Sequence, residues 1–459
     1  MRFKKFGKAF LMSALSAGVV LGLTSCVQSY SVGYLYVTGT NTASSSSNSG
    51  TISGFKIDHN KGGLTAIPGL PISSGGANPV RAVLLTGGRF VYVLNRGSNA
   101  SGGDCTTANQ CTGGNIVQFS VGGNGVLAPQ GQATFSQGKN PMRIFVDATG
   151  SYLYVLDHDA PDNYASSYNP ATNACTLALG AGVETCGDIT AYKIDPNTGR
   201  LTLVVNAQVT SATGAPLTYF PVPANPIDFV FSSSYVLTLS GTPQTGNSVF
   251  PYTYSATNGQ LTINQNSSQP LNIAAANAIV TAGGFVYVLD NETLTFTINV
   301  DGTQTPVTAQ SWVFPYSVGT NGSLQASTGG PAPISTSLAN PVYLIVESKG
   351  KWIYVANFGN NDTSQTSSNS GITGYVIDPS SHQLTEISGS PFGTGSGPSC
   401  LLEDPSNQFI YTANFNDSTV TGLTVDQNSG VLNPLNGSAN KPYPLPGPAT
   451  WCVATGRTS

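Results

Sequence analysis

The chain is 459 residues long and carries 17 basic and 21 acidic residues, so only 8% of its residues are charged. A typical globular protein has about a quarter charged residues, and a protein that binds a nucleic-acid backbone needs a basic patch or stripe, which this sequence lacks. The composition therefore excludes nucleic-acid binding, and the length suffices for a large hydrophobic core.

The N-terminus has the pattern of an export signal. Four cations within the first eight residues precede the apolar run AFLMSALSAGVVLGL, which is short for a segment that spans a bilayer. The run ends in Leu-Thr-Ser-Cys26, which resembles the bacterial lipobox, where cleavage before the cysteine leaves it to carry a lipid. We expect residues 1–25 to be a lipoprotein signal peptide, Cys26 to be the lipidated residue, and residues 26–33 to form a short linker.

The residue after Cys26 indicates the membrane. An inner-membrane retention signal usually places Asp at this position, whereas this chain has Val27. We therefore expect an exported protein anchored to the outer membrane of a two-membrane bacterium, at its periplasmic face or at the cell surface. An ordinary secretory signal with an incidental cysteine is the alternative.

A hairpin motif then recurs seven times along the chain. Examples are GFKIDHNKGGLT from Gly54, AYKIDPNTGRLT from Ala191 and GYVIDPSSHQLT from Gly374. Each copy has an aromatic residue or Leu, a β-branched residue two positions later, an Asp/Asn/Gly turn and a closing Leu. The turn residues accept left-handed backbone angles, so each copy is predicted to form a β-hairpin.

Each hairpin belongs to a larger unit of four predicted strands. The unit from Asn340 contains the runs VYLIVE, KWIYVAN, ITGYVID and QLTEIS, which we name A, B, C and D, separated by turn residues. Six whole units begin near Pro79, Pro141, Pro226, Ala274, Pro341 and Pro398.

A seventh unit is split between the two ends of the chain. Its strands B, C and D begin at GYLYVTGTN, and the missing strand A is the run GPATWCVATG around Pro448. A ring closes when the last strand completes the first sheet, which removes the exposed sheet edge. We predict an all-β fold, a single seven-bladed β-propeller of four-stranded antiparallel blades over residues 34–459, and a monomer. A β-solenoid is disfavoured because it has no use for a split unit.

Six cysteines follow Cys26, and an exported chain makes disulfides the default interpretation. Cys105 with Cys111, and Cys175 with Cys186, each flank a polar loop and are expected to form local bridges. Cys400 and Cys452 remain, two and four residues past their strand-A prolines, so both are expected to face the same way on neighbouring inner strands. A bond between them would lock the ring; two reduced, buried thiols are the alternative. A zinc site lacks a C-x-x-C pair and a nearby His, and we expect no metal and no cofactor.

Short motifs at the ends of the B strands add a family resemblance. The tetrapeptides YVLN at 92–95, YVAN at 354–357 and YTAN at 411–414, with the Y-x-I-D-x-x-x-G-x-L hairpins, resemble the lactonase family of propellers, which includes bacterial 6-phosphogluconolactonase and fungal carboxy-muconate cyclase. The resemblance covers nearly all of the mature chain and implies the propeller fold. It also implies lactone hydrolysis by a His, a Glu and arginines that converge in the funnel.

The sequence departs from that catalytic pattern. Asn78, Asn140, Asn225 and Asn340 precede the strand-A prolines, and His59 and His382 fall in C–D turns on the opposite face. Glu347 and Glu403, the nearest acids on inner strands, fall toward the A–B end. The arginines are present, but an evident acid–base set is not.

The A strands of a propeller line its channel, and the D–A and B–C connections share one rim. Long B–C connections at 96–115, 157–188 and 358–371 predict ligand contact at that rim. Residues two past each strand-A start are expected to face the funnel: Arg81, Arg143, Asp228, Ala276, Tyr343, Cys400 and Thr450. The ends of the B strands are expected to place further ligand-binding residues at the same mouth: Asn95, Arg96, Asp157, His158, Asp290, Asn357 and Asn414.

These residues admit two interpretations each. Arg81 and Arg143 with Asp228 can clamp an anionic or sugar-like ligand, or form an ion pair that plugs a narrow channel. His158, between Asp157 and Asp159, is a candidate general base, or a solvated loop residue. These two acids with Asp162 are also a weak calcium candidate, without an EF-hand pattern.

Two functions follow from different classes. The favoured one is a cell-envelope lipoprotein that acts as a binding or scaffold module for a saccharide, a small molecule such as a lactone, or an envelope protein. The alternative is an exported lactonase-type hydrolase that opens a sugar or aryl lactone with Arg81, Arg143 and His158 as catalytic residues.

Overall fold

The computed structural model describes residues 30–41, 49–85, 87–98, 111–161, 186–210, 214–232, 234–242, 246–263, 269–292, 295–300, 303–308, 310–359, 369–435 and 442–456. The expected signal peptide, Cys26 and most of the linker lie outside the described residues, as do Cys105, Cys175 and Asp162. Within these ranges, no helix has the length and apolar character needed to cross a membrane.

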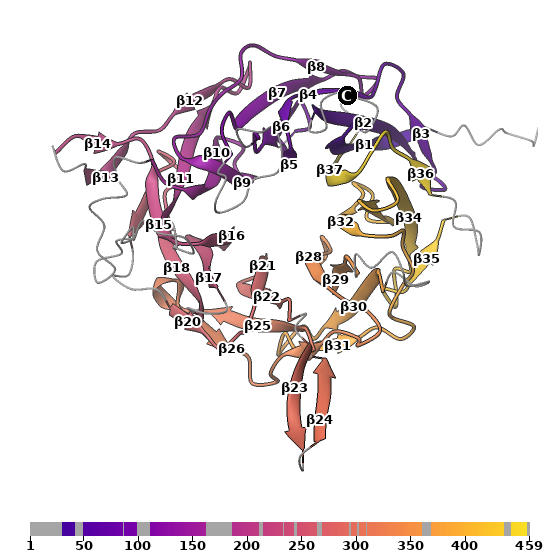
Figure 1. The fold of residues 1–459 in the computed structure, drawn as a ribbon. Helices are drawn as coiled ribbons and strands as arrows, with labels where there is room; N and C mark the ends of the chain where they lie inside the picture. The colour runs from indigo at the N-terminus through magenta and orange to yellow at the C-terminus, as the bar shows by residue number, and fades with distance from the viewer. Residues whose placement is uncertain are drawn as a thin grey trace, which may run out of the picture.

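Seven antiparallel sheets stand around a central channel, as Figure 1 shows. Each sheet has its A strand at the channel and its D strand at the periphery, and we number the blades 1 to 7 by the chain order of their B strands. The prediction of a seven-bladed all-β propeller is confirmed.

Every blade contributes one strand to each of the four classes, in order from blade 1 to blade 7. The A strands are β37 (Ala449–Gly456), β5 (Pro79–Leu84), β9 (Lys139–Val146), β16 (Pro226–Ser232), β21 (Ala276–Ala282), β28 (Pro341–Val346) and β32 (Pro398–Glu403). The B strands are β1 (Ser31–Thr40), β6 (Phe90–Asn95), β10 (Tyr152–Asp159), β17 (Tyr235–Thr242), β22 (Phe285–Asp290), β29 (Trp352–Asn357) and β33 (Phe409–Asn414). The C strands are β2 (Ser49–Asp58), β7 (Asn115–Val121), β11 (Cys186–Ile194), β18 (Gly246–Tyr254), β25 (Trp312–Val318), β30 (Gly371–Ile377) and β34 (Thr419–Val425). The D strands are β3 (Leu64–Ala66), β8 (Leu127–Pro129), β12 (Leu201–Leu203), β19 (Leu261–Ile263), β26 (Leu324–Ala326), β31 (Leu384–Glu386) and β35 (Leu432–Pro434).

Five short strands extend the outer part of their blades. Each pairs with the C strand of blade 1, 3, 4, 5 or 7 on the way to the next A strand. They are β4 (Ile72–Ala77), β15 (Phe220–Ala224), β20 (Gln269–Leu271), β27 (Ala332–Pro333) and β36 (Tyr443–Pro444). A 3₁₀ turn, η2 (Thr320–Gly322), precedes β26.

The two ends of the chain share blade 1, as the split unit predicts. The C-terminal strand β37 pairs antiparallel with β1, so that Cys452 lies opposite Val37 and Val453 lies opposite Tyr36. In Figure 1, yellow β37 lies directly beside indigo β1. The innermost strand of the first blade is therefore the last strand of the chain.

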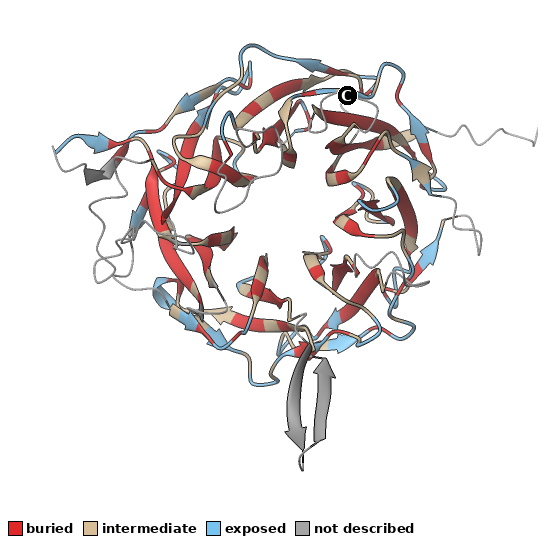
Figure 2. Cartoon of the chain, in the orientation of Figure 1, coloured by how far each residue is buried: buried red, intermediate tan, exposed pale blue. Residues whose placement is uncertain are grey.

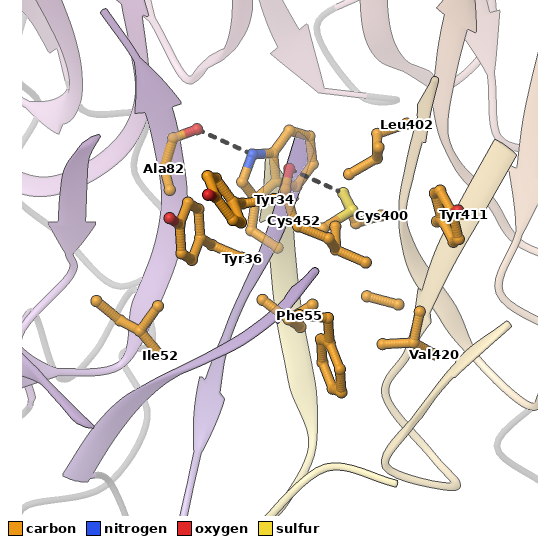
Figure 3. Packing of buried hydrophobic residues seen from close by; sticks show 14 of the residues in the cluster. Tyr34, Tyr36, Ile52, Phe55, Ala82, Cys400, Leu402, Tyr411, Val420 and Cys452 are labelled. Atoms are coloured by element: carbon orange, nitrogen blue, oxygen red, sulfur yellow. Dashed lines mark hydrogen bonds between the residues drawn. A yellow bond between two sulfur atoms is a disulfide. The ribbon is translucent and has the colours of Figure 1, made fainter. Parts of the chain in front are cut away.

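A disulfide joins this closing strand to the preceding blade. Cys400 on β32 and Cys452 on β37 are bonded, with Cα atoms 5.8 Å apart, among the buried side chains in Figure 3. The expectation that both face the same way is wrong, because the two cysteines occupy successive rather than equivalent register positions of their A strands. The two sulfurs approach from facing sides of adjacent blades. Cys111 and Cys186 are also disulfide-bonded.

The hydrophobic core lies between the blades. Figure 2 shows buried residues along the inner strands and exposed residues at the outer turns. Strand-B tyrosines cross each seam and donate to a backbone carbonyl in the C–D turn of the next blade, with O···O distances of 2.6 to 2.9 Å for Tyr36 to Gly125, Tyr92 to Gly199, Tyr154 to Gly259, Tyr354 to Gly430 and Tyr411 to Gly62. The tyrosine and the turn glycine of the recurring motif are thus partners across a seam.

The long connections are more widely distributed than the sequence predicts. The connection between β22 and β25 carries the hairpin β23 (Thr295–Val300) and β24 (Thr303–Thr308), which projects from the ring in Figure 1. The D–A connection after blade 3 carries a second hairpin, β13 (Asn206–Thr210) and β14 (Pro216–Leu217). The expectation that all insertions are B–C connections is therefore wrong, although both kinds of connection share one rim.

Candidate functional site

The strand-A residues that reach the channel are set by a β-bulge at the start of each A strand. In blade 2, Pro79 pairs with Asn95 while Arg81 pairs with Leu94, so that one extra residue is accommodated. The residue after this bulge occupies the same register position in every blade. We name these positions the upper ring: Arg81, Arg143, Asp228, Ala278, Tyr343, Cys400 and Trp451.

Two members of the upper ring differ from the sequence prediction. In blade 1 the bulge follows Ala449 rather than Pro448, which places Trp451 in the ring instead of Thr450. In blade 5 the bulge follows Ala276, which places Ala278 there instead. The prolines are therefore an imperfect guide to register. The Asn residues before four of these strands have positive φ angles of 50° to 59°, which explains why Asn recurs there: Asn78, Asn140, Asn225 and Asn340.

The channel contains a cavity of about 530 Å³ lined by A strands from all seven blades. Five members of the upper ring line it, namely Arg81, Arg143, Asp228, Tyr343 and Trp451. Ala278 and Cys400 are buried and do not line it. The structure thus brings together the two arginines, the Asp and the Tyr that the sequence places at the funnel.

Arg143 and Asp228 form an ion pair within this cavity. Nε of Arg143 lies 3.1 Å from Oδ1 of Asp228, and the two side chains are 15% and 5% exposed. The backbone N–H groups of Phe229 and Ile279 also donate to the Asp228 carboxylate, at 3.0 and 3.2 Å. Three donors therefore hold this carboxylate, which stabilises its ionised form.

Arg81 packs against aromatic rings instead of a carboxylate. Its guanidinium carbon lies 3.5 Å from the centroid of the Trp451 ring and 5.6 Å from that of Tyr343. The Tyr343 ring meets Trp451 edge-on at 4.6 Å, and the Trp451 indole N–H donates to the carbonyl of Ala82 at 3.1 Å. No described residue gives Arg81 a hydrogen bond or an ion pair.

The electrostatics of the cavity are unbalanced. Burial and, second, the charge of Arg143 lower the pKa of Arg81 to about 9, so Arg81 remains a cation at neutral pH. Burial raises the pKa of Tyr343, which keeps the phenol neutral. Two guanidinium groups thus face one carboxylate, and the upper ring carries one positive charge in excess.

His158 does not join this cluster. It lies on β10 beyond the end of its pairing with the start of β9, with Nδ1 2.9 Å from Oδ1 of Asp159 and the side chain 20% exposed. The residues that line the channel cavity do not include it. The structure therefore separates His158 from the two arginines with which it is expected to act.

The residues expected at the mouth are mostly buried inside their own blades. Asn95 donates to Asn115 at 2.8 Å, Asn357 to Thr373 at 3.1 Å and Asn414 to Thr421 at 3.0 Å, so these amides brace strands B and C. Asp290 is buried and accepts from the backbone N–H of Ala275 at 2.9 Å. These residues stabilise the blades and do not line the cavity, which corrects the expectation for them. Arg96 donates to the side chain of Asn140 and links blades 2 and 3.

Asp157 lies directly opposite Asp188 across strands β10 and β11, and both are fully buried. Ser136 donates to Asp157 at 2.7 Å, and Thr190 donates to Asp188 at 3.2 Å. Burial raises the pKa of Asp157 to about 8; burial and the Asp157 charge raise the pKa of Asp188. The pair is a structural feature of blade 3, outside the channel.

The remaining candidate acids and histidines lie away from the two arginines. Glu403 lines the opposite end of the cavity and accepts from the backbone N–H of Ser348 at 2.8 Å. Glu347 caps its A–B turn by accepting from the N–H of Lys349 at 2.9 Å. His59 and His382, in C–D turns, stack on Tyr30 and Phe285.

The sequence pattern does not reveal one of the site residues. Trp451 forms the floor on which Arg81 rests, yet alignment on Pro448 selects its neighbour. The signal that finds it is strand pairing: Trp451 lies opposite Thr38, as Arg81 lies opposite Leu94.

Comparison with known sequence families gives a partial match. Residues 321–449 match the family described as Lactonase, 7-bladed beta-propeller, which is less than a third of the chain. No curated protein matches the sequence.

Comparison with solved structures covers nearly the whole propeller. The periplasmic gluconolactonase PpgL of Pseudomonas aeruginosa has 16% identity and a TM-score of 0.61 over 93% of this chain and 99% of its own. A protein of Bacteroides uniformis provisionally assigned as a 6-phosphogluconolactonase has 12% identity and a TM-score of 0.60 over 92% and 99%. A protein of Lactobacillus plantarum has 15% identity and a TM-score of 0.57 over 92% and 99%. At these identities the likeness shows the fold: this chain has the architecture of the lactonase-like seven-bladed propellers.

Proposed function

We propose that this protein is an exported, lipid-anchored binding propeller that holds a small organic anion in its channel. The observation that carries the proposal is the state of Arg81. Its guanidinium lies inside the ring with no hydrogen bond or ion pair from any described residue, and it rests on the face of Trp451.

The energetics of a buried cation support an anionic ligand. A charge removed from water is costly unless it is paired, and cation–π contact with Trp451 and Tyr343 offsets only part of that cost. The Arg143–Asp228 pair is already satisfied, which leaves the donors of Arg81 facing the lumen. A carboxylate matches the planar fork of a guanidinium bidentately and would neutralise the excess charge of the upper ring.

The export pattern supports a place in the cell envelope. The positive n-region, the apolar run and the Leu-Thr-Ser-Cys26 sequence together favour a lipid anchor at Cys26 and the outer membrane. A polar, charge-poor surface and disulfide-bonded cysteines suit an extracytoplasmic protein.

The test is calorimetric titration of the mature protein, truncated after Cys26, with small carboxylates and with the matching neutral amides. We expect carboxylates to bind and amides not to bind. Arg81→Met should abolish the heat of binding, whereas Arg89→Met, which alters an exposed arginine of the same blade, should retain it. Equal binding by Arg81→Met and by the unaltered protein would overturn the proposal.

Lactone hydrolysis is the second candidate function. Its support is the match of residues 321–449 to the lactonase family and the presence of two arginines in the cavity. The periplasmic gluconolactonase with the same fold places that activity outside the cytoplasm in one bacterium. An exported enzyme acting on a sugar or aryl lactone is therefore the alternative.

The chemistry of the cavity favours binding over hydrolysis. Ester cleavage needs a base that activates water close to a cation that stabilises the developing oxyanion. Asp228 is held by three donors, Glu403 lies at the other end of the cavity, and His158 is not part of its lining. Turnover of a panel of sugar and aryl lactones, lost in Arg81→Met and in His158→Ala, would establish the hydrolase instead.

A further inference from the structure

The channel wall below the upper ring is apolar in every blade. The residue two positions past each upper-ring residue occupies the next lumen-facing register position, which in blade 2 lies opposite Tyr92 of strand B. We name these positions the apolar ring: Val83, Phe145, Val230, Val280, Ile345, Leu402 and Val453. All seven line the cavity, and none of them carries a polar atom on its side chain.

The polar groups beyond the apolar ring are already engaged. Thr281 donates to the carbonyl of Phe231 at 3.2 Å, and Glu403 accepts from the backbone N–H of Ser348. The other residues that line this end are Leu84, Val146, Val346 and Ala454. The described wall below Arg81 therefore offers almost no side-chain partner to a ligand hydroxyl.

This distribution discriminates between classes of anion. A sugar acid carries a hydroxyl on nearly every carbon, and each hydroxyl that enters an apolar site without a partner loses its hydrogen bonds to water. An aryl or alkyl chain has the opposite preference, because it leaves water for contact with Val, Leu, Ile and Phe side chains. The cavity of about 530 Å³ lies within the range of small-molecule sites.

Resting on the proposed anion site, we infer that the ligand is a hydrophobic monocarboxylate, such as an aryl or medium-chain alkyl acid, rather than a sugar acid. Its carboxylate contacts Arg81 beside Trp451, and its body lies against the apolar ring. One negative charge suffices, because the upper ring carries one positive charge in excess.

Competition among three probes tests this inference. Octanoate, phenylacetate and gluconate are titrated into the mature protein by calorimetry. We expect octanoate and phenylacetate to bind at least about ten-fold more tightly than gluconate, since several hydroxyls are left without partners. Tighter binding of gluconate would overturn the hydrophobic class and leave the anion site intact. Failure of all three to bind would overturn both proposals.

A wall variant adds a second measurement. Val280→Thr keeps the shape of the side chain and places a hydroxyl in the apolar ring, so we expect octanoate to bind about ten-fold more weakly. Val205→Thr changes an exposed valine outside the channel and is the matched control. Unchanged octanoate affinity in Val280→Thr, with an unchanged melting temperature, would contradict the placement of the ligand body.

Discussion

The phenol of Tyr411 in blade 7 donates a 2.6 Å hydrogen bond to the carbonyl of Gly62 in the C–D turn of blade 1. This bond crosses the seam where the ring closes, between segments 349 positions apart in the sequence. Gly62 has φ of 65°, and a Cβ there would lie 2.5 Å from the ring of Phe409, so the seam requires glycine on steric grounds. The recurrence of Tyr in strand B and of Gly in the C–D turn reflects this one contact.

Tyr411→Phe is expected to lower the free energy of unfolding by about 1–3 kcal/mol, because it leaves the carbonyl of the buried Gly62 without its donor. Tyr354→Phe removes the equivalent bond to Gly430 at an internal seam. Urea unfolding should give similar losses for both variants. A loss confined to Tyr354→Phe would show that the closing seam does not depend on this bond.

The Cys400–Cys452 bond closes the ring covalently, and its removal should cost roughly 2–5 kcal/mol. Cys400→Ser and Cys452→Ser should lose similar amounts under non-reducing conditions, and the double variant should lose little more, because each change breaks the same bond. Thermal unfolding with and without reductant measures this. Single variants as stable as the unaltered protein without reductant would contradict the role of the bridge.

The buried Asp157–Asp188 pair predicts that stability falls as pH rises. Burial raises the pKa of Asp157 to about 8, and the pKa of Asp188 is also raised, so the folded state retains protons that the unfolded state releases near pH 4. Oδ1 of Asp188 has no hydrogen-bond partner among the described residues. The stability contributed by the protonated pair is complete below about pH 4 and is lost as pH rises from there through about 8.

Asp188→Asn is the variant that tests this pH dependence. The amide stays neutral, so unfolding measured between about pH 4 and about pH 8 should show a flatter curve and a more stable variant at the alkaline end. Asp195→Asn, in an exposed turn, is the control. The neighbouring titratable groups Asp159 and Tyr192 are unchanged in both variants. An Asp188→Asn curve parallel to that of the unaltered protein would be the contrary result.

Arg143 has a structural role that the sequence does not reveal. Arg143→Met should lower the free energy of unfolding by about 3 kcal/mol, because Asp228 would be left buried without its cation. Adding Asp228→Asn should recover most of that loss, as the double-mutant cycle would show. This corrects a view of Arg143 as a residue that acts on the ligand alone. An unchanged melting temperature in Arg143→Met would argue against a stabilising ion pair.

The sequence predicts the fold well because its signals are local. Turn residues such as those of AYKIDPNTGRLT, the four-strand units and the displaced strand around Pro448 are sufficient to derive seven blades and their closure. The arginines are also found, because prolines mark most A strands. These features depend on short-range backbone preferences that a single chain displays.

The site is predicted less well because it depends on register and on side-chain direction. The bulge after Ala449 shifts blade 1 by one position, which exchanges Thr450 for Trp451 in the ring. The Asn residues that end the B strands lie near the rim in sequence terms, yet Asn95 and Asn414 turn into their blades to bond strand C. Neither outcome can be read from composition or spacing, since both depend on contacts between strands distant in sequence.

A crystal structure of the mature protein with a brominated phenylacetate would show directly whether Arg81 holds the carboxylate of an apolar ligand. We predict a carboxylate within hydrogen-bonding distance of the Arg81 guanidinium and an anomalous bromine peak beside the apolar ring. Bromine found only at the outer surface, with an empty channel at saturating ligand, would refute both the anion site and its hydrophobic ligand.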